Sequence, residues 1–179
     1  MQVTRTYLEL RDRSAFRPFP EATPGACVAR VEDCPVSFYR YLYTEVGRPH
    51  GWRDRLDWTD AEIRAHIADQ AVSVWVLSVR GAPAGYFELV KGTDTSVELA
   101  YFGLVPEFTG RGLGKWLLST AVECAWSAGA ARIWLHTCSL DHPAALPNYL
   151  RRGFTPFKTE HYTVKLSPAA KATSAPPPA

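Results

Sequence analysis

The fold is decided by residues 96–129, which read SVELAYFGLVPEFTGRGLGKWLLSTAVECAWSAG. Residues Ser96 to Val105 are rich in β-branched, aromatic and aliphatic side chains, and Pro106 ends this predicted strand because it has no amide hydrogen for a ladder. From Leu113 the apolar residues recur at spacings of three and four until Gly129, which predicts an amphipathic helix. The stretch therefore predicts a strand, a glycine-rich turn and a helix.

The turn itself, TGRGLGK at residues 109–115, has the properties of a phosphate-binding site. Glycines leave amide hydrogens exposed at the positive end of a helix dipole, and phosphate oxygens bind well there. The P-loop motif is excluded, because Lys115 is followed by Trp rather than Ser or Thr. The dinucleotide fingerprint G-x-G-x-x-G is excluded as well, because Gly110, Gly112 and Gly114 alternate.

Length and composition favour one globular domain. The 179 residues fit a single core, and we expect that domain to span residues 1–166. The remaining segment, 167–179, is built of Pro, Ala, Ser, Thr and Lys and is expected to be a disordered tail.

Charge and cysteine usage exclude several classes of function. Lys and Arg number 20 against 18 Asp and Glu, a balance that gives no support to nucleic-acid or membrane binding. No stretch approaches the roughly eighteen apolar residues of a membrane span, and the first residues lack a signal-peptide core, so we expect a cytoplasmic protein. The four cysteines show neither a C-x-x-C pair nor zinc-type clustering, which predicts reduced thiols and no metal site.

The remaining elements follow from periodicity and turn signals. Thr59 and Glu62 form a predicted capping box at the start of one helix, and Asp141 is the predicted cap of another. Three consecutive strands on short connections should form an antiparallel meander, and the strand after the central helix should run parallel to the motif strand. The predicted helices are 36–47, 60–69, 113–128 and 143–151; the predicted strands are 4–10, 28–31, 72–80, 84–90, 96–105 and 132–137, with one or two more in 154–166, and Gly81-Ala82-Pro83 joining two of them.

The motif stretch resembles motif A of the GNAT superfamily of N-acyltransferases, a strand followed by [Q/R]-x-x-G-x-G/A at a helix start. Gly112 and Gly114 match its glycines, and Thr109 stands where the family usually has Gln or Arg. Residues 142–154 are also similar to the family's N-x-x-A-x-x-x-Y-x-x-x-G-F, with His142 in place of the Asn. The resemblance extends from about Val28 to Leu166.

The resemblance implies an α+β fold, with a central, mixed and mostly antiparallel sheet flanked by helices and with two parallel strands splayed apart at the acyl-CoA site. It also implies acetyl-CoA as cosubstrate, with its diphosphate held mainly by backbone amides and with its pantetheine arm lying along the motif strand. The cofactor-binding residues implied in this way are Phe102, Gly103, Leu104, Thr109, Gly110, Arg111, Gly112, Leu113, Gly114, Lys115 and His142.

Acyl transfer to an amine needs a base, because a free alkyl amine has a pKa of about 10. Glu98 lies eleven positions before Thr109, which is the register of the general-base Glu in the histone-acetylating branch of the superfamily. Its neighbours Val97 and Leu99 place it on the opposite face of the strand from theirs. Glu98 is therefore the expected base, acting directly or through water, and His136 on a later strand is the second candidate.

The other catalytic groups follow from the same resemblance. Tyr149 matches the family's Tyr that donates to the sulfur, and a phenol stays protonated at neutral pH. By position, the amide of about Leu104 would hold the oxyanion.

The substrate is expected to contact the loop between the first two helices. Its residues His50, Trp52 and Arg53, together with Arg55 and Trp58, could hold an amine by cation–π contact or an acidic substrate by Arg pairing. The tryptophans could equally be core residues.

The resulting prediction is an N-acetyltransferase acting on a primary amine of a small molecule or peptide in a direct ternary complex. The alternatives are a transferase that uses a longer acyl-CoA or another nucleophile, and an acyl-CoA-binding sensor without turnover. Many members of the superfamily dimerise through C-terminal strands, so a homodimer is one implied oligomeric state.

Overall fold

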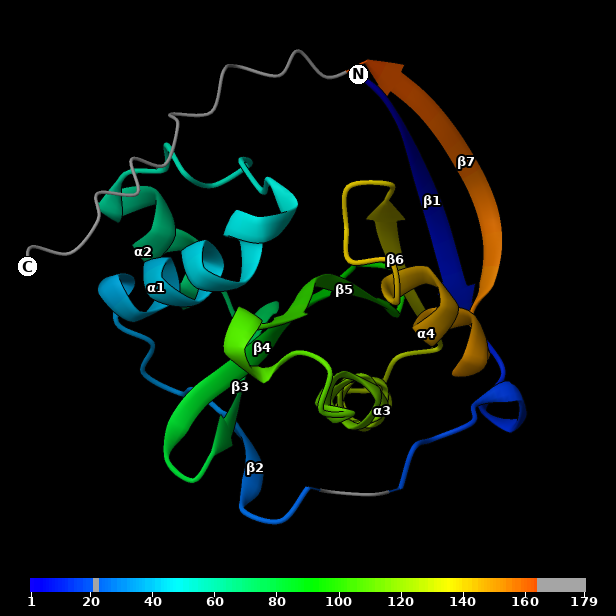
Figure 1. Cartoon of the computed structure of the whole chain (residues 1–179), viewed down its shortest axis with the longest axis horizontal. Helices are drawn as coiled ribbons and strands as arrows, with labels where there is room; N and C mark the ends of the chain where they lie inside the picture. Colours follow the sequence, from blue (N-terminus) through cyan, green and yellow to red (C-terminus); the bar gives the residue numbers. More distant parts are fainter. Residues whose placement is uncertain (21–22, 164–179) are drawn as a thin grey trace, which may run out of the picture.

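The computed structural model describes residues 1–20 and 23–163, and within them seven strands form one sheet in the order β2-β3-β4-β5-β6-β1-β7 (Figure 1). The strands are β1 (Gln2–Leu10), β2 (Ala26–Arg30), β3 (Val72–Val79), β4 (Ala82–Lys91), β5 (Ser96–Leu104), β6 (Arg132–Cys138) and β7 (Thr155–Thr163). The helices are α1 (Val36–Gly47), α2 (Asp60–Ala68), α3 (Leu113–Ser127) and α4 (Ala145–Arg151), with short 3-10 turns η1 (Arg13–Ala15), η2 (Arg48–His50) and η3 (Pro106–Phe108). The predicted α+β class with a mixed, mostly antiparallel sheet is confirmed.

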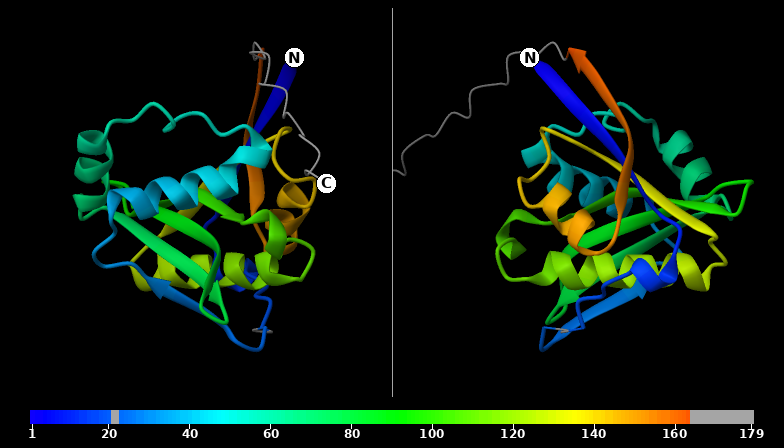
Figure 2. Two further views of the ribbon diagram at one scale, coloured as in Figure 1. Left: turned by 60° about the vertical axis from the view of Figure 1, so that its left-hand side comes forward. Right: turned by 90° about the vertical axis from the view of Figure 1, so that its right-hand side faces the viewer.

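The helices cover both faces of this sheet (Figure 2). Buried residues of α3, among them Leu117 and Leu118, pack with those of β4, β5 and β6 in one core cluster. Leu42 of α1 and Ile63 of α2 pack with buried residues of β3 and β4 in a second cluster. The predicted capping box at α2 is present, since Thr59 Oγ1 accepts from the Glu62 amide and the Glu62 carboxylate accepts from the Thr59 amide.

The meander of β3, β4 and β5 is antiparallel, as predicted. Its first turn is tighter than expected, because Arg80 and Gly81 both adopt positive φ and β4 already begins at Ala82. Pro83 therefore lies within β4 instead of in the connection. A register shift follows at once, so the ladder is interrupted where the proline has no amide to donate.

The parallel strands β5 and β6 stay together for only a short distance. Three residue pairs join them, from Ser96 opposite Arg132 to Glu98 opposite Trp134. Beyond Glu98 the two strands separate, and Leu99 to Leu104 face β6 without pairing to it. The separation leaves a gap in the middle of the sheet, between the C-terminal parts of β5 and β6.

The first strand, β1, lies between β6 and β7 and pairs antiparallel with both of them (Figure 1). Arg5 is opposite Cys138 of β6 on one side and opposite Glu160 of β7 on the other. Leu8 and Leu10 point into the α3 core. Because side chains alternate along a strand, Arg5 and Tyr7 point to the other face.

The helix predicted at 143–151 begins later, at Ala145, and Asp141 is not its cap. The Asp141 carboxylate accepts instead from Thr137 Oγ1 at 2.7 Å and from the Cys138 amide at 2.9 Å, so it closes the turn after β6. The predicted disorder of 167–179, and strand residues 164–166, lie outside the described part of the chain. No described helix is both long and apolar enough to cross a bilayer.

Candidate active site

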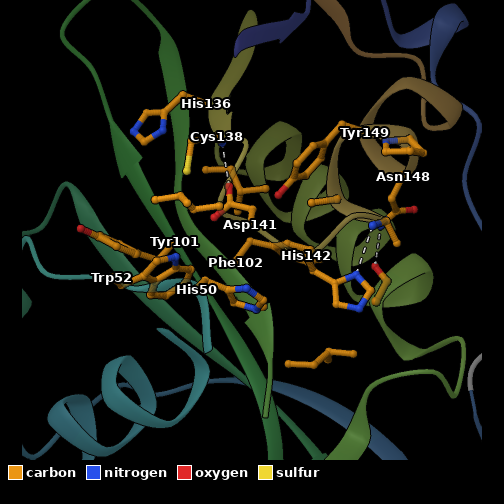
Figure 3. Close-up of a pocket in the computed structure, with 18 of the residues that line it drawn as sticks. His50, Trp52, Tyr101, Phe102, His136, Cys138, Asp141, His142, Asn148 and Tyr149 are labelled. Atoms are coloured by element: carbon orange, nitrogen blue, oxygen red, sulfur yellow. Dashed lines mark hydrogen bonds between the residues drawn. The ribbon is translucent and has the colours of Figure 1, made fainter. Parts of the chain in front are cut away.

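A cavity of about 710 Å³ passes through the gap between β5 and β6. One end is lined by the glycine turn and by α4, through Gly110, Gly112, Lys115, Asn148 and Tyr149. The other end is lined by residues of the α1–α2 loop, β1, β6 and β7. Figure 3 shows labelled side chains from both ends facing this space.

The glycine turn presents a row of available backbone donors. Gly110 and Gly112 have φ values of 75° and 78°, in the left-handed region that favours glycine, and a Cβ at either one would meet no atom within 4 Å. Among the described residues, no protein oxygen accepts a hydrogen bond from the amides of 110–114, whereas the Lys115 amide already donates to the Gly112 carbonyl. The start of α3 therefore fits a diphosphate by hydrogen bonding and by helix dipole.

Most of the residues expected to bind the coenzyme line this cavity. They are Phe102, Gly103, Leu104, Thr109, Gly110, Gly112, Gly114, Lys115 and His142. Two side chains do not: Arg111 lies over the Phe108 ring at 5.1 Å, and Leu113 is buried in the core. His142 is oriented by its own backbone turn, because its Nδ1 accepts from the Ala144 amide at 3.1 Å.

The unpaired edge of β5 faces the cavity with backbone donors. The Val105 amide donates to the Ala84 carbonyl at 2.9 Å, on the β4 side. Because successive amides of a strand point in opposite directions, those of Leu104 and Phe102 point away from β4 and toward the gap. The two amides are about 6.6 Å apart along the strand, so each could donate to a different acceptor placed in this gap.

Tyr149 of α4 points into the cavity (Figure 3). Its ring is 6% exposed and packs edge-on against Phe102 and Phe154, at 6.0 and 6.2 Å between ring centroids. No described residue is hydrogen-bonded to its hydroxyl, and burial together with the Asp141 charge raises its pKa. The group is thus a protonated donor with its hydrogen bond still to make. Neighbouring Asn148 joins α4 to α3, since its Nδ2 donates to the Gly114 carbonyl.

Of the two candidate bases, His136 lines the cavity and Glu98 does not. Glu98 is the last β5 residue paired with β6, and burial and the Glu88 charge raise its pKa while Arg55 opposes them. It is not among the cavity-lining residues, which begin on β5 at Leu99. His136 does line the cavity, and burial and the Arg5 charge lower its pKa, so it is neutral near pH 7.

The three expected substrate-binding residues, His50, Trp52 and Arg53, also line the cavity. Trp52 packs against Tyr101 of β5 at 5.0 Å between ring centroids, and the Tyr101 hydroxyl faces Asp54 at 3.4 Å. His50 lies edge-on to His142 at 6.3 Å, so residues of the two ends approach each other there. Tyr101 and Asp54 had no sequence motif that would mark them.

Arg55 and Trp58 pack against the core and do not line the cavity. Arg55 Nη1 donates to Glu88 Oε2 at 2.8 Å, and its guanidinium lies over the Trp58 and Tyr101 rings at 4.8 and 4.3 Å. The Glu88 carboxylate is fully buried and is also bonded to Tyr39 and His66. Of the two alternatives for these residues, the structure favours core packing.

Metal chemistry has no cluster to support it in the described part of the chain: no three His, Cys, Asp or Glu side chains there form a group that could hold an ion. The four cysteines, all of them described, are unpaired. The polar side chains that line the cavity include phenols, imidazoles and guanidinium groups, together with Thr109, Lys115, Cys138, Asn148 and the carboxylates of Asp54 and Asp141.

Comparison with known proteins identifies the family. The acetyltransferase (GNAT) family model matches residues 36–154, which is more than half of the chain. No curated protein sequence matches. A GCN5-related N-acetyltransferase from Kribbella flavida superposes with a TM-score of 0.65 at 18% identity, over 88% of this chain and 56% of that one.

Two other solved structures give the same result. A GCN5-related N-acetyltransferase from Sphaerobacter thermophilus has a TM-score of 0.67 at 15% identity, over 88% of this chain and 49% of that one. A ribosomal-protein-S18-alanine N-acetyltransferase from Escherichia coli has a TM-score of 0.57 at 17% identity, over 73% of this chain and 77% of that one. This chain thus spans about half the length of the first two structures, and all three show the fold alone. Together, the family match, the fold and the cavity geometry lead to one conclusion: this chain belongs to the GNAT family of acetyltransferases.

Proposed function

We propose that the protein transfers an acetyl group from acetyl-CoA to a primary amine of a small molecule or peptide, in a direct ternary complex. The observation that carries this proposal is the continuity of one cavity from the free amides of 110–114, past Tyr149, to the loop that bears Trp52. Donor and acceptor could therefore meet in the gap between β5 and β6. Holding both in that geometry supplies much of the rate enhancement of a two-substrate reaction.

Acetyl-CoA supplies the activated acyl group, and the chain supplies positioning. The amides of 110–114, with Lys115 beside them, would hold the diphosphate. The Leu104 amide points into the gap, where it would hold the thioester oxygen and stabilise the oxyanion, while the Phe102 amide would face the pantetheine arm. Tyr149 would donate its proton to the departing thiolate, because its hydroxyl is protonated, buried and unpartnered.

The amine must lose a proton, and the geometry favours His136 for the direct step. His136 lines the cavity and is neutral near pH 7, whereas the Glu98 carboxylate lies outside the lining. We keep Glu98 as the proposed base of a water-mediated route, since its pKa is raised and it stands where the strands part. Variants of the two residues separate these routes.

Thiol release from acetyl-CoA over a panel of primary amines tests the proposal. We expect amine-dependent release and an acetylated product of the corresponding mass. A parallel series of longer acyl-CoA donors tests the alternative donor, which a higher kcat/KM for the longer chains would favour. Tight binding of CoA without turnover on any amine would overturn the proposal and favour a sensor.

A further inference from the structure

We infer that the acceptor amine carries a carboxylate and that Arg5 binds this carboxylate. The inference rests on the proposed function and adds a substrate class to it: small amines with a carboxylate a few bonds from the amino group, as in free amino acids. The inference comes from Arg5 on β1. Because β1 lies beside β6, Arg5 reaches the end of the cavity that is lined by the α1–α2 loop, here called the acceptor end.

Arg5 lines the cavity with an incompletely satisfied guanidinium. Its Nε is buried and has no hydrogen-bond partner among the described residues. The remaining nitrogens are near two phenols: Tyr7 is a side-chain hydrogen-bond partner, and Nη2 makes a long contact, 3.5 Å, with the Tyr162 hydroxyl. The Arg5 Cζ lies 5.0 Å from the Tyr162 ring centroid. A guanidinium offers five donors in a planar fork that matches a carboxylate, so most of this capacity is unused.

Two carboxylates on elements beside β1, those of Glu160 and Asp141, have other partners. Glu160 is directly opposite Arg5 in register, but its oxygens bind Lys158 at 2.6 Å and the Tyr7 hydroxyl at 2.8 Å. Asp141 accepts from Thr137 and from the Cys138 amide. No ion pair in the described part of the chain includes Arg5. Among the described carboxylates, none lies within ion-pair distance of the Arg5 guanidinium.

The other Lys and Arg residues that line the cavity are Arg53, Lys115, Arg151 and Arg152. Arg151 and Arg152 stand at the end of α4, on the same side of the cavity as the glycine turn. Lys115 and Arg152 lie against Phe19 at 5.3 and 5.8 Å, beside the glycine turn. Arg55 of the acceptor loop is held by Glu88. Arg5 and Arg53 are therefore the cationic side chains that line the acceptor end and could bind an anionic group.

The register of β1 and β6 relates Arg5 to the proposed base. Arg5 is opposite Cys138, and Tyr7 is opposite His136, so Arg5 and His136 are diagonal neighbours on one face. Diagonal positions on adjacent strands are about 7–8 Å apart. A molecule with its amine at His136 and a carboxylate at Arg5 would need only a few bonds between the two groups.

Paired substrates test the inference: glycine and β-alanine against glycinamide and β-alaninamide, together with larger amino acids and their amides. In the wild type, we expect amines with a carboxylate to be preferred. Arg5→Gln should lower kcat/KM by about tenfold to a hundredfold more for them than for the carboxamides, because a charge-assisted bidentate pair is lost. The comparison is made at about pH 8, where His136 is deprotonated with or without the Arg5 charge that lowers its pKa. Arg5→Lys should recover part of the loss, since it keeps the charge but not the fork.

Arg11→Gln is the matched control, because it removes the same charge from the same segment at an exposed residue paired with Glu9. Thermal unfolding and CoA calorimetry on each variant show whether folding and coenzyme binding are intact. Equal losses for acids and amides in Arg5→Gln, with CoA binding intact, would overturn the inference.

Calorimetry with the N-acetylated acids and N-acetylated amides, in the presence of CoA, separates this inference from the proposed function. A preference for the acids that disappears in Arg5→Gln would support the anion site even if no turnover were found. Turnover without any such preference would leave the transferase function standing and overturn the carboxylate inference.

Discussion

Arg55 and Glu88 form a buried ion pair, with Nη1 and Oε2 at 2.8 Å and side-chain exposures of 10% and 0%. Arg55 belongs to the loop between α1 and α2, and Glu88 belongs to the middle of β4. The pair therefore fastens the loop that carries Trp52 and Arg53 onto the sheet. Tyr39 and His66 complete the carboxylate's hydrogen bonds.

Removal of the Arg55 guanidinium should destabilise the fold strongly. In Arg55→Met, Glu88 stays buried without its cation, and we expect the free energy of unfolding to fall by about 3–5 kcal/mol. The control is Arg48→Met, whose side chain is 67% exposed and pairs with Glu45, a surface pair that should contribute about 1 kcal/mol or less. Urea unfolding of both variants measures the difference, and equal losses would contradict the account.

Tyr149→Phe should separate catalysis from stability. Because the Tyr149 hydroxyl has no partner among the described residues, its removal should leave the free energy of unfolding and the affinity for CoA nearly unchanged. Loss of a general acid should lower kcat by about two to four orders of magnitude. Steady-state kinetics with thermal unfolding check both expectations. A kcat equal to that of the wild type would remove Tyr149 from the mechanism.

The pH dependence should identify the base. A base must be deprotonated to act, so kcat at saturating acceptor should be lost as the pH falls through the pKa of that group. Burial and Arg5 lower the pKa of His136 from its ordinary value, so the midpoint of this loss should lie below about pH 6.5. His136→Gln should lower the plateau and abolish this limb, while Glu98→Gln should retain it. The reverse pattern would assign the base to Glu98.

The parts of the fold that depend on local patterns could be predicted from the sequence. The strand, turn and helix of 96–129 have strong local signals, and both the parallel pairing of β5 with β6 and the helix at 36–47 are confirmed. Asp141 was misassigned because a cap and a turn-closing carboxylate have the same sequence pattern. In the folded protein its carboxylate accepts from Thr137 Oγ1 and from the Cys138 amide instead.

Long-range arrangement could not be predicted in the same way. Nothing in residues 2–10 indicates that β1 lies between β6 and β7, so the place of Arg5 at the cavity could not be predicted from the sequence. Glu88 lies within an apolar strand, where its three partners come from α1, α2 and the loop between them. Alternation placed Glu98 on the opposite face of β5 from Val97 and Leu99. It could not show that the cavity lining begins on β5 one residue later, at Leu99.

The central claim is that the free amides at the start of α3 hold a coenzyme diphosphate, and calorimetry with CoA on a matched pair of glycine variants tests it most directly. Gly112 and Gly129 have φ values of 78° and 91°, and a Cβ at either would meet no atom within 4 Å. Replacement of either by Ala should therefore cost a similar 1–2 kcal/mol or so of backbone strain. Only the methyl group at Gly112 would enter the space in front of the amides.

We predict measurable binding of CoA to the wild type, unchanged affinity in Gly129→Ala, and a loss of about tenfold or more in Gly112→Ala. No heat with the wild type at millimolar CoA, or equal affinities in the two variants, would contradict the account.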